Sequence, residues 1–468
     1  MDKETFRQYG HEIVDWIADY LENVKKYPVK STVDPGDIKS RLPKHPPAEG
    51  EDMQSIWKDF QDIIMPGITH WQHPGWFAYF PANNSPASVL GEMLTAGIGA
   101  QCMIWETSPA AAELEETVME WLRQMLGLPV ELKGVIQDTA STATLCALLT
   151  TREVATGFSF NEKGAGPKLR VYASAEAHSS IEKGVKIAGY GRENLCHIET
   201  DANYAMRPDK LEKAIADDIR AGMKPACVIA TIGTTSSTAV DPLPETGLIC
   251  RKYGVWLHVD AAMTGTAAIL EEKRDMLKGS EFIDSLVFNP HKWLFTNFDC
   301  SAYFVKDPQL LIRTMSINPE YLKTSRDEQV NNYRDWGIQL GRRFRALKLW
   351  FVIREFGVNG LKEIIRKHIA MAQDIADRIK SSPEFELMAP VSTNLVCFRW
   401  NDGQKDEKLL NELNKILLKK INESGRVYLT HTVLSGRYTI RMAVGQRTTE
   451  KDDVERAWEI INTAAKKL

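Results

Sequence analysis

The chain has 468 residues, of which 43% are hydrophobic and 26% are charged, and its formal net charge is −4. This length predicts two or three structural units, and the near balance of charge speaks against nucleic acid or a membrane surface as a partner. The sequence lacks a run of about 18 apolar residues and a basic-then-apolar leader, so we expect no spanning helix and no secretory signal. Seven scattered cysteines without a Cys-x-x-Cys pair indicate reduced thiols and a cytoplasmic location.

The first 64 residues predict two helices joined by a stiff connection. Apolar residues recur at three-to-four spacing over 3–25, which indicates an amphipathic helix, and a second helix is expected over 51–64. Five prolines between 28 and 47 predict an extended segment there. Two such helices have too little core of their own, so we expect them to pack on another surface, such as a second copy of the chain.

An aromatic segment follows at 71–81, with the sequence Trp-Gln-His-Pro-Gly-Trp-Phe-Ala-Tyr-Phe-Pro. It is too aromatic, and too interrupted by proline and glycine, to be a simple core helix. It is either a hydrophobic anchor for the amino-terminal helices or the wall of a binding pocket. His70 and His73 form the one close histidine pair, but without a third ligand nearby we expect no metal site.

From about 130 to 305, short apolar runs alternate with helical patterns. The expected strands are 134–136, 169–172, 227–232, 255–259, 285–288 and 301–305, and the expected helices are 141–156, 179–189, 208–222 and 242–253. This alternation predicts an α/β fold with a mostly parallel sheet covered on both faces. Ligands of such sheets bind at the carboxyl ends of the strands.

Thr139, Ala140, Ser141 and Thr142 precede the helical run that starts at 143. Hydroxyl groups and free amides at a helix start can form a phosphate cup, although an ordinary Ser/Thr cap has the same appearance. The chain has no Gly-x-x-x-x-Gly-Lys loop, and its Gly-x-Gly runs lack the third glycine of a dinucleotide-binding loop.

A lysine stands between two aromatic residues in Asn-Pro-His-Lys-Trp at 289–293, directly after an apolar run. Confinement there removes water from Lys292, which favours the neutral amine that forms a Schiff base with an aldehyde. A surface lysine after a strand is the alternative. Thirty-two residues upstream, another apolar run ends in Asp260, which alone would be a cap or turn residue. Together, the lysine and the acid match the two groups that pyridoxal phosphate requires, one for its aldehyde and one for its pyridinium nitrogen.

These segments resemble the group II pyridoxal-phosphate-dependent amino-acid decarboxylases, and within them the aromatic L-amino-acid decarboxylases. The matching motifs are His-Val-Asp-Ala-Ala at 258–262, Asn-Pro-His-Lys-Trp at 289–293, Ala-His-Ser-Ser at 177–180, Gly-Arg-Arg-Phe-Arg-Ala-Leu-Lys-Leu-Trp at 341–350 and Phe-Ala-Tyr-Phe-Pro at 77–81. The resemblance covers essentially the whole chain. It implies a homodimer of the aspartate-aminotransferase-like fold (fold type I), divided into an amino-terminal helical flap (1–82), a large cofactor domain (83–349) and a small α+β domain (350–468).

The resemblance also implies roles for individual residues around pyridoxal 5'-phosphate. Lys292 would hold the cofactor, Asp260 would pair with the ring nitrogen, and His178 would stack on the ring and assist protonation. Further cofactor contacts would come from Ala140, Ser141, Thr235, Asn289 and His291. The chain departs from many relatives at Asp138 and Met263. Asp138 would repel a phosphate, so its side chain is expected to point away, and no role is assigned to Met263.

On the substrate side, the resemblance places the ring of an aromatic amino acid among Trp71, Tyr79, Phe80 and Pro81, with Met103 contributed by the partner subunit. Ala82, Asn83 and Asn84 replace the small hydroxyl residues of animal members, which leaves polar contacts to ring substituents open. Tyr321, in the polar stretch 316–332, would protonate the carbanion after carbon dioxide leaves.

Three features near the carboxyl end are less specific. Gly341 matches a position where glycine accompanies indole substrates and serine accompanies phenolic ones in plant relatives, or it is structural and permits a tight turn. In the resemblance, Arg441 and Arg447 fall in a region of active-site structure, without an assigned role.

The substrate is expected among tryptophan, 5-hydroxytryptophan, dopa, tyrosine and phenylalanine. An aromatic aldehyde synthase of the same family is the alternative function, followed by a transaminase and an inactive binding protein.

Overall fold

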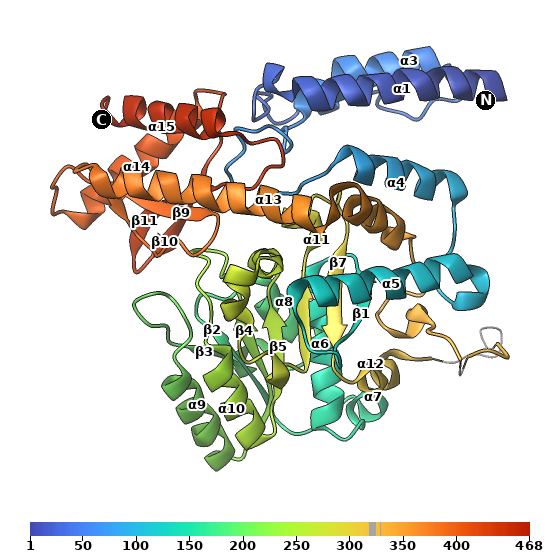
Figure 1. Cartoon of the computed structure of the whole chain (residues 1–468), viewed down its shortest axis with the longest axis vertical. Helices are drawn as coiled ribbons and strands as arrows, with labels where there is room; N and C mark the ends of the chain where they lie inside the picture. Colours follow the sequence, from blue (N-terminus) through green and yellow to red (C-terminus); the bar gives the residue numbers. More distant parts are fainter. Residues whose placement is uncertain (318–323, 328) are drawn as a thin grey trace.

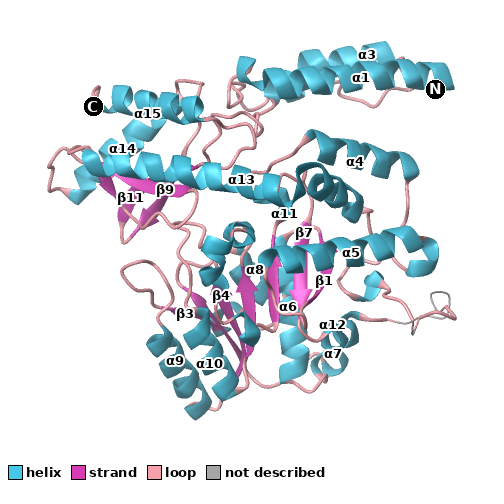
Figure 2. Cartoon of the chain, in the orientation of Figure 1, coloured by secondary structure: helices cyan, strands magenta, loops and turns pink. Residues whose placement is uncertain are grey.

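The structure is a computed structural model and describes residues 1–317, 324–327 and 329–468. Its largest element is a seven-stranded sheet in the order β1-β7-β6-β5-β4-β2-β3. The strands are β1 (Lys133–Gln137), β2 (Leu169–Ser174), β3 (Leu195–Ile198), β4 (Lys224–Thr231), β5 (Trp256–Asp260), β6 (Ser285–Phe288) and β7 (Ser301–Val305). Strands β2 to β6 pair in parallel, whereas β7 is antiparallel to both β6 and β1. The predicted α/β fold with a mostly parallel sheet is confirmed (Figure 2).

Helices cover both faces of this sheet because successive strand residues point to opposite sides and both sides are apolar. In β5, Leu257 and Val259 belong to one core and Trp256 belongs to the other. The covering helices are α5 (Pro109–Leu126), α6 (Ala140–Ala155), α7 (Phe160–Lys163), α8 (Ser180–Ile187), α9 (Pro208–Arg220), α10 (Leu243–Tyr253) and α12 (Pro308–Met315). Helices α5, α9 and α10 pack on the first face, and α6, α8 and α12 pack on the second.

The strand directions bring five connections to one edge of the sheet. Strands β2, β4, β5 and β6 run in parallel, and β1 has the same direction because it pairs antiparallel with β7. The segments after β1, β2, β4, β5 and β6 therefore begin at the same edge. This edge contains most of the predicted cofactor residues.

The amino-terminal segment forms helices α1 (Lys3–Asn23), α2 (Asp37–Arg41), α3 (Met53–Asp59) and α4 (Pro86–Ile98). Figure 1 shows α1 and α3 side by side at the end of the molecule opposite α9 and α10. They are joined through aromatic rings, since Trp16 meets Trp57 and Phe60 at centroid distances of 5.8 and 5.3 Å. The prediction of an extended connection over 28–47 is wrong at 37–41, where a turn at Gly36 allows five residues between the prolines to form α2.

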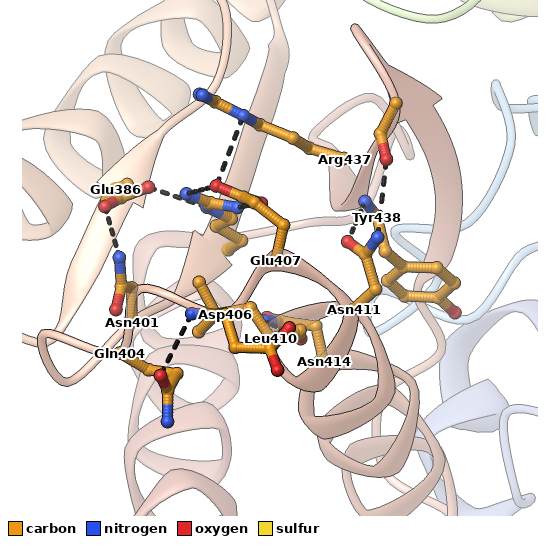
Figure 3. Close-up of polar contacts among 12 residues, drawn as sticks. Glu386, Asn401, Gln404, Asp406, Glu407, Leu410, Asn411, Asn414, Arg437 and Tyr438 are labelled. Carbon is orange, nitrogen blue, oxygen red and sulfur yellow. Dashed lines mark hydrogen bonds and ion pairs between the residues drawn. The ribbon is translucent and has the colours of Figure 1, made fainter.

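A second sheet lies in the carboxy-terminal part, in the order β10-β11-β9-β8. Its strands are β8 (Phe385–Leu387), β9 (Leu395–Trp400), β10 (Thr430–Leu434) and β11 (Arg437–Ala443), and it packs with α13 (Arg345–Ser381), α14 (Glu407–Asn422) and α15 (Lys451–Ala465). Figure 3 shows how polar groups fasten α14 to this sheet: Asn411 accepts the Tyr438 N–H at 2.7 Å, and Glu407 lies 3.6 Å from the Arg437 guanidinium. The division at 82/83 and 349/350 stays a prediction; α13 runs through residue 350.

No helix in the described part of the chain has both the length and the apolar character needed to cross a bilayer.

Candidate active site

Lys292 lies on α11 (Pro290–Trp293), a four-residue helix that follows the fully buried strand β6. Pro290 starts this helix without loss of a hydrogen bond, because the first N–H of a helix has no partner inside it. Burial lowers the pKa of the Lys292 amine, and the charge of Asp260 opposes that shift. The Lys292 Nζ atom lies 5.5 Å from the centre of the Phe80 ring. The lysine is half-buried, which agrees with the expected loss of hydration.

The aromatic neighbours of Lys292 in the sequence are engaged elsewhere. The Trp293 indole N–H donates to His368 Nδ1 at 2.9 Å inside the core. His291 accepts the Cys300 N–H at Nδ1 and packs on the Phe298 ring. Phe80, from the aromatic segment 71–81, instead lies over the amine. The idea that the two adjacent rings flank the lysine side chain is therefore incorrect, since residues next to each other on a helix point in different directions.

Asp260 is the last residue of β5 and is 6% exposed. Its Oδ1 accepts the Ala262 N–H at 3.0 Å, which holds the carboxylate at the strand end. Its negative charge acts on the pKa values of both Lys292 and His178. The structure therefore brings the predicted lysine and carboxylate to the same edge of the sheet.

His178 follows β2 and belongs to the same group. Its Nδ1 accepts the Ser180 N–H at 3.1 Å and lies 2.7 Å from Ser180 Oγ. The residue as a whole is exposed in the single chain, but partial burial of its ring lowers the pKa of His178. The negative charge of Asp260 opposes this shift, and the positive charge of Lys292 adds to it. A neutral ring is favoured, and the bond to Nδ1 leaves its proton on Nε2.

The predicted phosphate cup lies at the start of the 16-residue helix α6. Thr139 caps the helix by accepting the Thr142 N–H, and the N–H groups of Ala140 and Ser141 have no acceptor inside the helix because of their position. Such a helix start favours a phosphate group. Asp138 is held by the Thr139 N–H at 2.5 Å and by Gln339 Nε2 at 3.1 Å, so both of its oxygens already have donors.

Asn289 is the residue before α11 and is 3% exposed. Its Oδ1 accepts a hydrogen bond from Ser301 Oγ at 2.6 Å. This bond fixes the side chain at the end of β6 and leaves the Asn289 amide N–H groups for another partner. Burial lowers the pKa of the adjacent His291 to about 3, and the positive charge of Lys292 contributes, so this ring is neutral at physiological pH.

Arg441, on β11, connects the small sheet to the site. Its Nη2 donates to the Thr235 carbonyl at 2.7 Å and its Nε to the Ser236 carbonyl at 3.3 Å, while the guanidinium lies 5.2 Å from the Phe80 ring. Its Nη1 donates to Thr430 Oγ1 at 3.2 Å. The Arg441 donors are thus used to hold the turn at Thr235 and the aromatic segment in place.

The aromatic segment divides into a buried and an exposed part. Trp76 and Phe77 are buried and anchor the segment, as one of the two interpretations predicts. Trp71 and Tyr79 stack at 5.9 Å with an angle of 15° between their rings, and Tyr79 is 50% exposed. Phe80 and the buried Pro81 continue toward Lys292. The segment therefore contains an anchor and also presents rings beside the lysine.

The roles of three further residues stay predictions. The Met103 carbonyl accepts the Arg334 N–H at 2.8 Å. Gly341 has no left-handed backbone conformation, so its φ does not demand glycine; a Cβ there would lie 3.2 Å from Gln101 Nε2. Tyr321 lies outside the described residues.

Comparison with known proteins places this arrangement in a family. Residues 35–401 match the model of the pyridoxal-dependent decarboxylase conserved domain. The chain belongs to the pyridoxal-dependent decarboxylase family. It is 44% identical to tryptophan decarboxylase 2 of Oryza sativa subsp. japonica, covering 100% of this chain and 96% of the relative. It is also 44% identical to a phenylacetaldehyde synthase of Arabidopsis thaliana, covering 100% and 97%.

Solved structures agree with this assignment. The chain matches Catharanthus roseus tryptophan decarboxylase in complex with L-tryptophan with a TM-score of 0.94 and 41% identity, over 100% of this chain and 99% of the other. This decarboxylase therefore has the type I fold of pyridoxal-phosphate enzymes, and it is a carboxy-lyase that uses pyridoxal 5'-phosphate. Its site fits the cofactor because a desolvated lysine, a buried carboxylate and a free helix start lie at one sheet edge.

Proposed function

We propose that this enzyme converts aromatic L-amino acids to the aromatic amine and carbon dioxide, as a cytoplasmic homodimer. The observation that carries the substrate class is the Phe80 ring 5.5 Å from Lys292 Nζ, continuous with the stacked pair of Trp71 and Tyr79. Flat rings at this position favour a flat substrate side chain over a charged or short one. The relatives that act on tryptophan support the same class.

Each residue of the site has a distinct task in this proposal. Bound pyridoxal phosphate supplies an electron-accepting ring that stabilises the negative charge left when carbon dioxide departs. Lys292 would hold the cofactor through its amine. Asp260 would keep the ring nitrogen protonated, and the start of α6 with Asn289 and His291 would hold the phosphate. His178 and Tyr321 would handle the protons of the reaction, with Tyr321 delivering the final one.

The experiment is a panel of tryptophan, 5-hydroxytryptophan, dopa, tyrosine, phenylalanine and, as a non-member of the class, glutamate. Carbon dioxide and the organic product are measured together with oxygen consumption. We expect one amine per carbon dioxide and no oxygen uptake with at least one aromatic substrate. Turnover of glutamate alone would contradict the proposal.

The same panel tests the alternative of an aldehyde synthase, which the similarity to a phenylacetaldehyde synthase of Arabidopsis thaliana supports. Such an enzyme would release aldehyde, ammonia and peroxide and consume oxygen. Tyr321 and His178 are both present in the sequence, and a proton donor that quenches the carbanion promptly leaves little time for oxygen to react. We therefore favour the amine.

Gly341→Ser tests the preference among aromatic substrates. The added side chain would approach Gln101, whose Oε1 already accepts the Arg342 N–H at 2.7 Å and is therefore not free to move away. If Gly341 leaves space for an indole ring, its replacement lowers kcat/KM for tryptophan about 10–200-fold more than for tyrosine or dopa. Equal losses for both classes, measured side by side, would mean that the glycine is structural.

Helix α4 carries the surface that we assign to the dimer interface. Leu90, Leu94 and Ile98 are 50%, 49% and 63% exposed at helical spacing, while Gly91 on the other face packs against α13. An apolar stripe of this kind is typical of an interface. Leu94→Glu with Ile98→Glu should give monomers in sedimentation and at least a tenfold loss of activity, because Met103 serves the partner's site in this proposal. Leu409, a leucine on α14 that is 44% exposed, provides the control, and Leu409→Glu should stay dimeric. An active monomeric parent would contradict the proposal.

A further inference from the structure

Asn83 makes three hydrogen bonds that join segments far apart in the sequence. Its Nδ2 donates to the Lys292 carbonyl and to the Gly445 carbonyl, each at 2.7 Å, and its Oδ1 accepts the Arg447 N–H at 2.9 Å. The residue is 1% exposed. Both amide hydrogens and the carbonyl oxygen are therefore used, and each bonds to the main chain.

We propose that Asn83 is a positioning residue that fixes the backbone of Lys292 against the 445–447 segment and so aims the lysine amine. The inference rests on Lys292 as the residue that holds the cofactor, but not on which amino acid is the substrate. An amide suits this position because it can donate two hydrogen bonds and accept one at the same time, whereas a hydroxyl group has only one hydrogen to donate. The Asn83 amide bridges the two carbonyls directly.

The residue after Lys292 is held by a different element. The Trp293 indole N–H donates to the buried His368 on α13 at 2.9 Å. This bond fixes one end of the lysine helix on α13, whereas Asn83 joins the Lys292 carbonyl to the 445–447 segment. Without Asn83, the Lys292 backbone loses this connection and can tilt about the anchored Trp293.

Close packing makes this segment a firm support. Gly445 lies so near the aromatic segment that a Cβ there would come within 2.9 Å of Pro81 Cγ and 3.1 Å of Asn394 Nδ2. Asn394 in turn donates to the Val444 carbonyl at 2.9 Å. Asn83 lies two residues beyond Pro81. It therefore fixes the positions of the aromatic segment, the lysine helix and the 445–447 segment relative to one another. A displacement of about 1 Å at a reacting group can cost about 100-fold in rate.

The test compares Asn83→Asp and Asn83→Ala with Asn84→Asp and Asn84→Ala, all as holoenzymes. Asn83→Asp keeps the shape of the side chain but places an oxygen against two carbonyl oxygens, and Asn83→Ala removes all three bonds. Asn84 is a matched control, because its bond to Gln72 uses the main-chain N–H and does not depend on the side chain. The readouts are kcat, KM, the visible circular dichroism of the bound cofactor and the pH midpoint of its yellow absorbance band.

We expect both Asn83 variants to lose at least about tenfold in kcat with KM within about threefold of the parent. Their cofactor dichroism should weaken and the pH midpoint of the band should move, whereas both Asn84 variants match the parent. Parental kcat and parental spectra in Asn83→Asp would overturn the inference. It would also be overturned if Asn83→Asp failed to fold while Asn84→Asp folded, since Asn83 would then be needed for folding. The two spectral readouts report on the lysine even if the aromatic substrate panel is negative.

Discussion

Lys292→Ala is expected to abolish turnover and to remove the yellow absorbance that borohydride bleaches. The variant loses both the covalent attachment of the cofactor and a group able to move protons beside it, and proton transfer alone is worth about 10²–10⁴-fold in rate. We therefore expect a loss of at least about a thousandfold in kcat. Absorbance spectroscopy before and after borohydride, together with an amine assay, measures both effects.

Lys348→Met is the matched control for this variant. Lys348 is fully buried, and burial lowers its pKa to about 8, but its ammonium pairs with Glu92 at 2.9 Å on the packed face of α4 and α13. Its removal should lower stability and leave the bleachable absorbance in place. If the absorbance survived in Lys292→Ala and disappeared in Lys348→Met, the cofactor lysine would have been assigned wrongly.

Asp260→Asn is expected to retain the cofactor and to lose at least about a hundredfold in kcat, which corresponds to about 2.7 kcal/mol of transition-state stabilisation. The amide matches the carboxylate in shape and can still accept the Ala262 N–H. It has no charge to keep the ring nitrogen protonated, so the electron-accepting power of the ring falls. Cofactor content is measured by absorbance after alkaline release, and kcat by product formation.

Asp241→Asn separates loss of charge in the site from loss of a buried carboxylate in general. Asp241 is 1% exposed and accepts the N–H groups of Met206 and Thr231, each at 2.7 Å. Asparagine has only one side-chain oxygen, so one of these two main-chain N–H groups would face the side-chain NH2 group and lose its acceptor. This loss should cost about 1–3 kcal/mol of stability and little in kcat. An unchanged rate in Asp260→Asn would show that the ring nitrogen has a different partner.

Local patterns in the sequence were enough to predict the main sheet and the edge that carries the site. Strands β4, β5 and β6 are apolar runs bounded by turn residues; Asp260 ends β5, and Lys292 lies on the short helix that follows β6. Strand β3 was not predicted, because its four residues at the sheet edge include the half-buried Cys196 and the exposed His197. Helix α2 was missed because it is a single short turn among prolines.

The contacts that complete the site could not be predicted, because they join distant segments. Phe80 lies over Lys292 across more than 200 residues, and Arg441 reaches the Thr235 carbonyl across 206. Asn83 appeared in the sequence only as a departure from relatives, and its bonds depend on how the 445–447 segment packs against Lys292. A sequence motif thus predicts which residues react. The residues that position them can be identified only from the folded structure.

The central claim is that Lys292 holds pyridoxal phosphate in this decarboxylase. Its most direct test is borohydride reduction of the holoenzyme, followed by protease digestion and peptide mass spectrometry. We predict one pyridoxyl-phosphate mass addition per chain, on Lys292 within the peptide that contains Asn-Pro-His-Lys-Trp. Addition to another lysine, or none in a fully active enzyme, would contradict the claim.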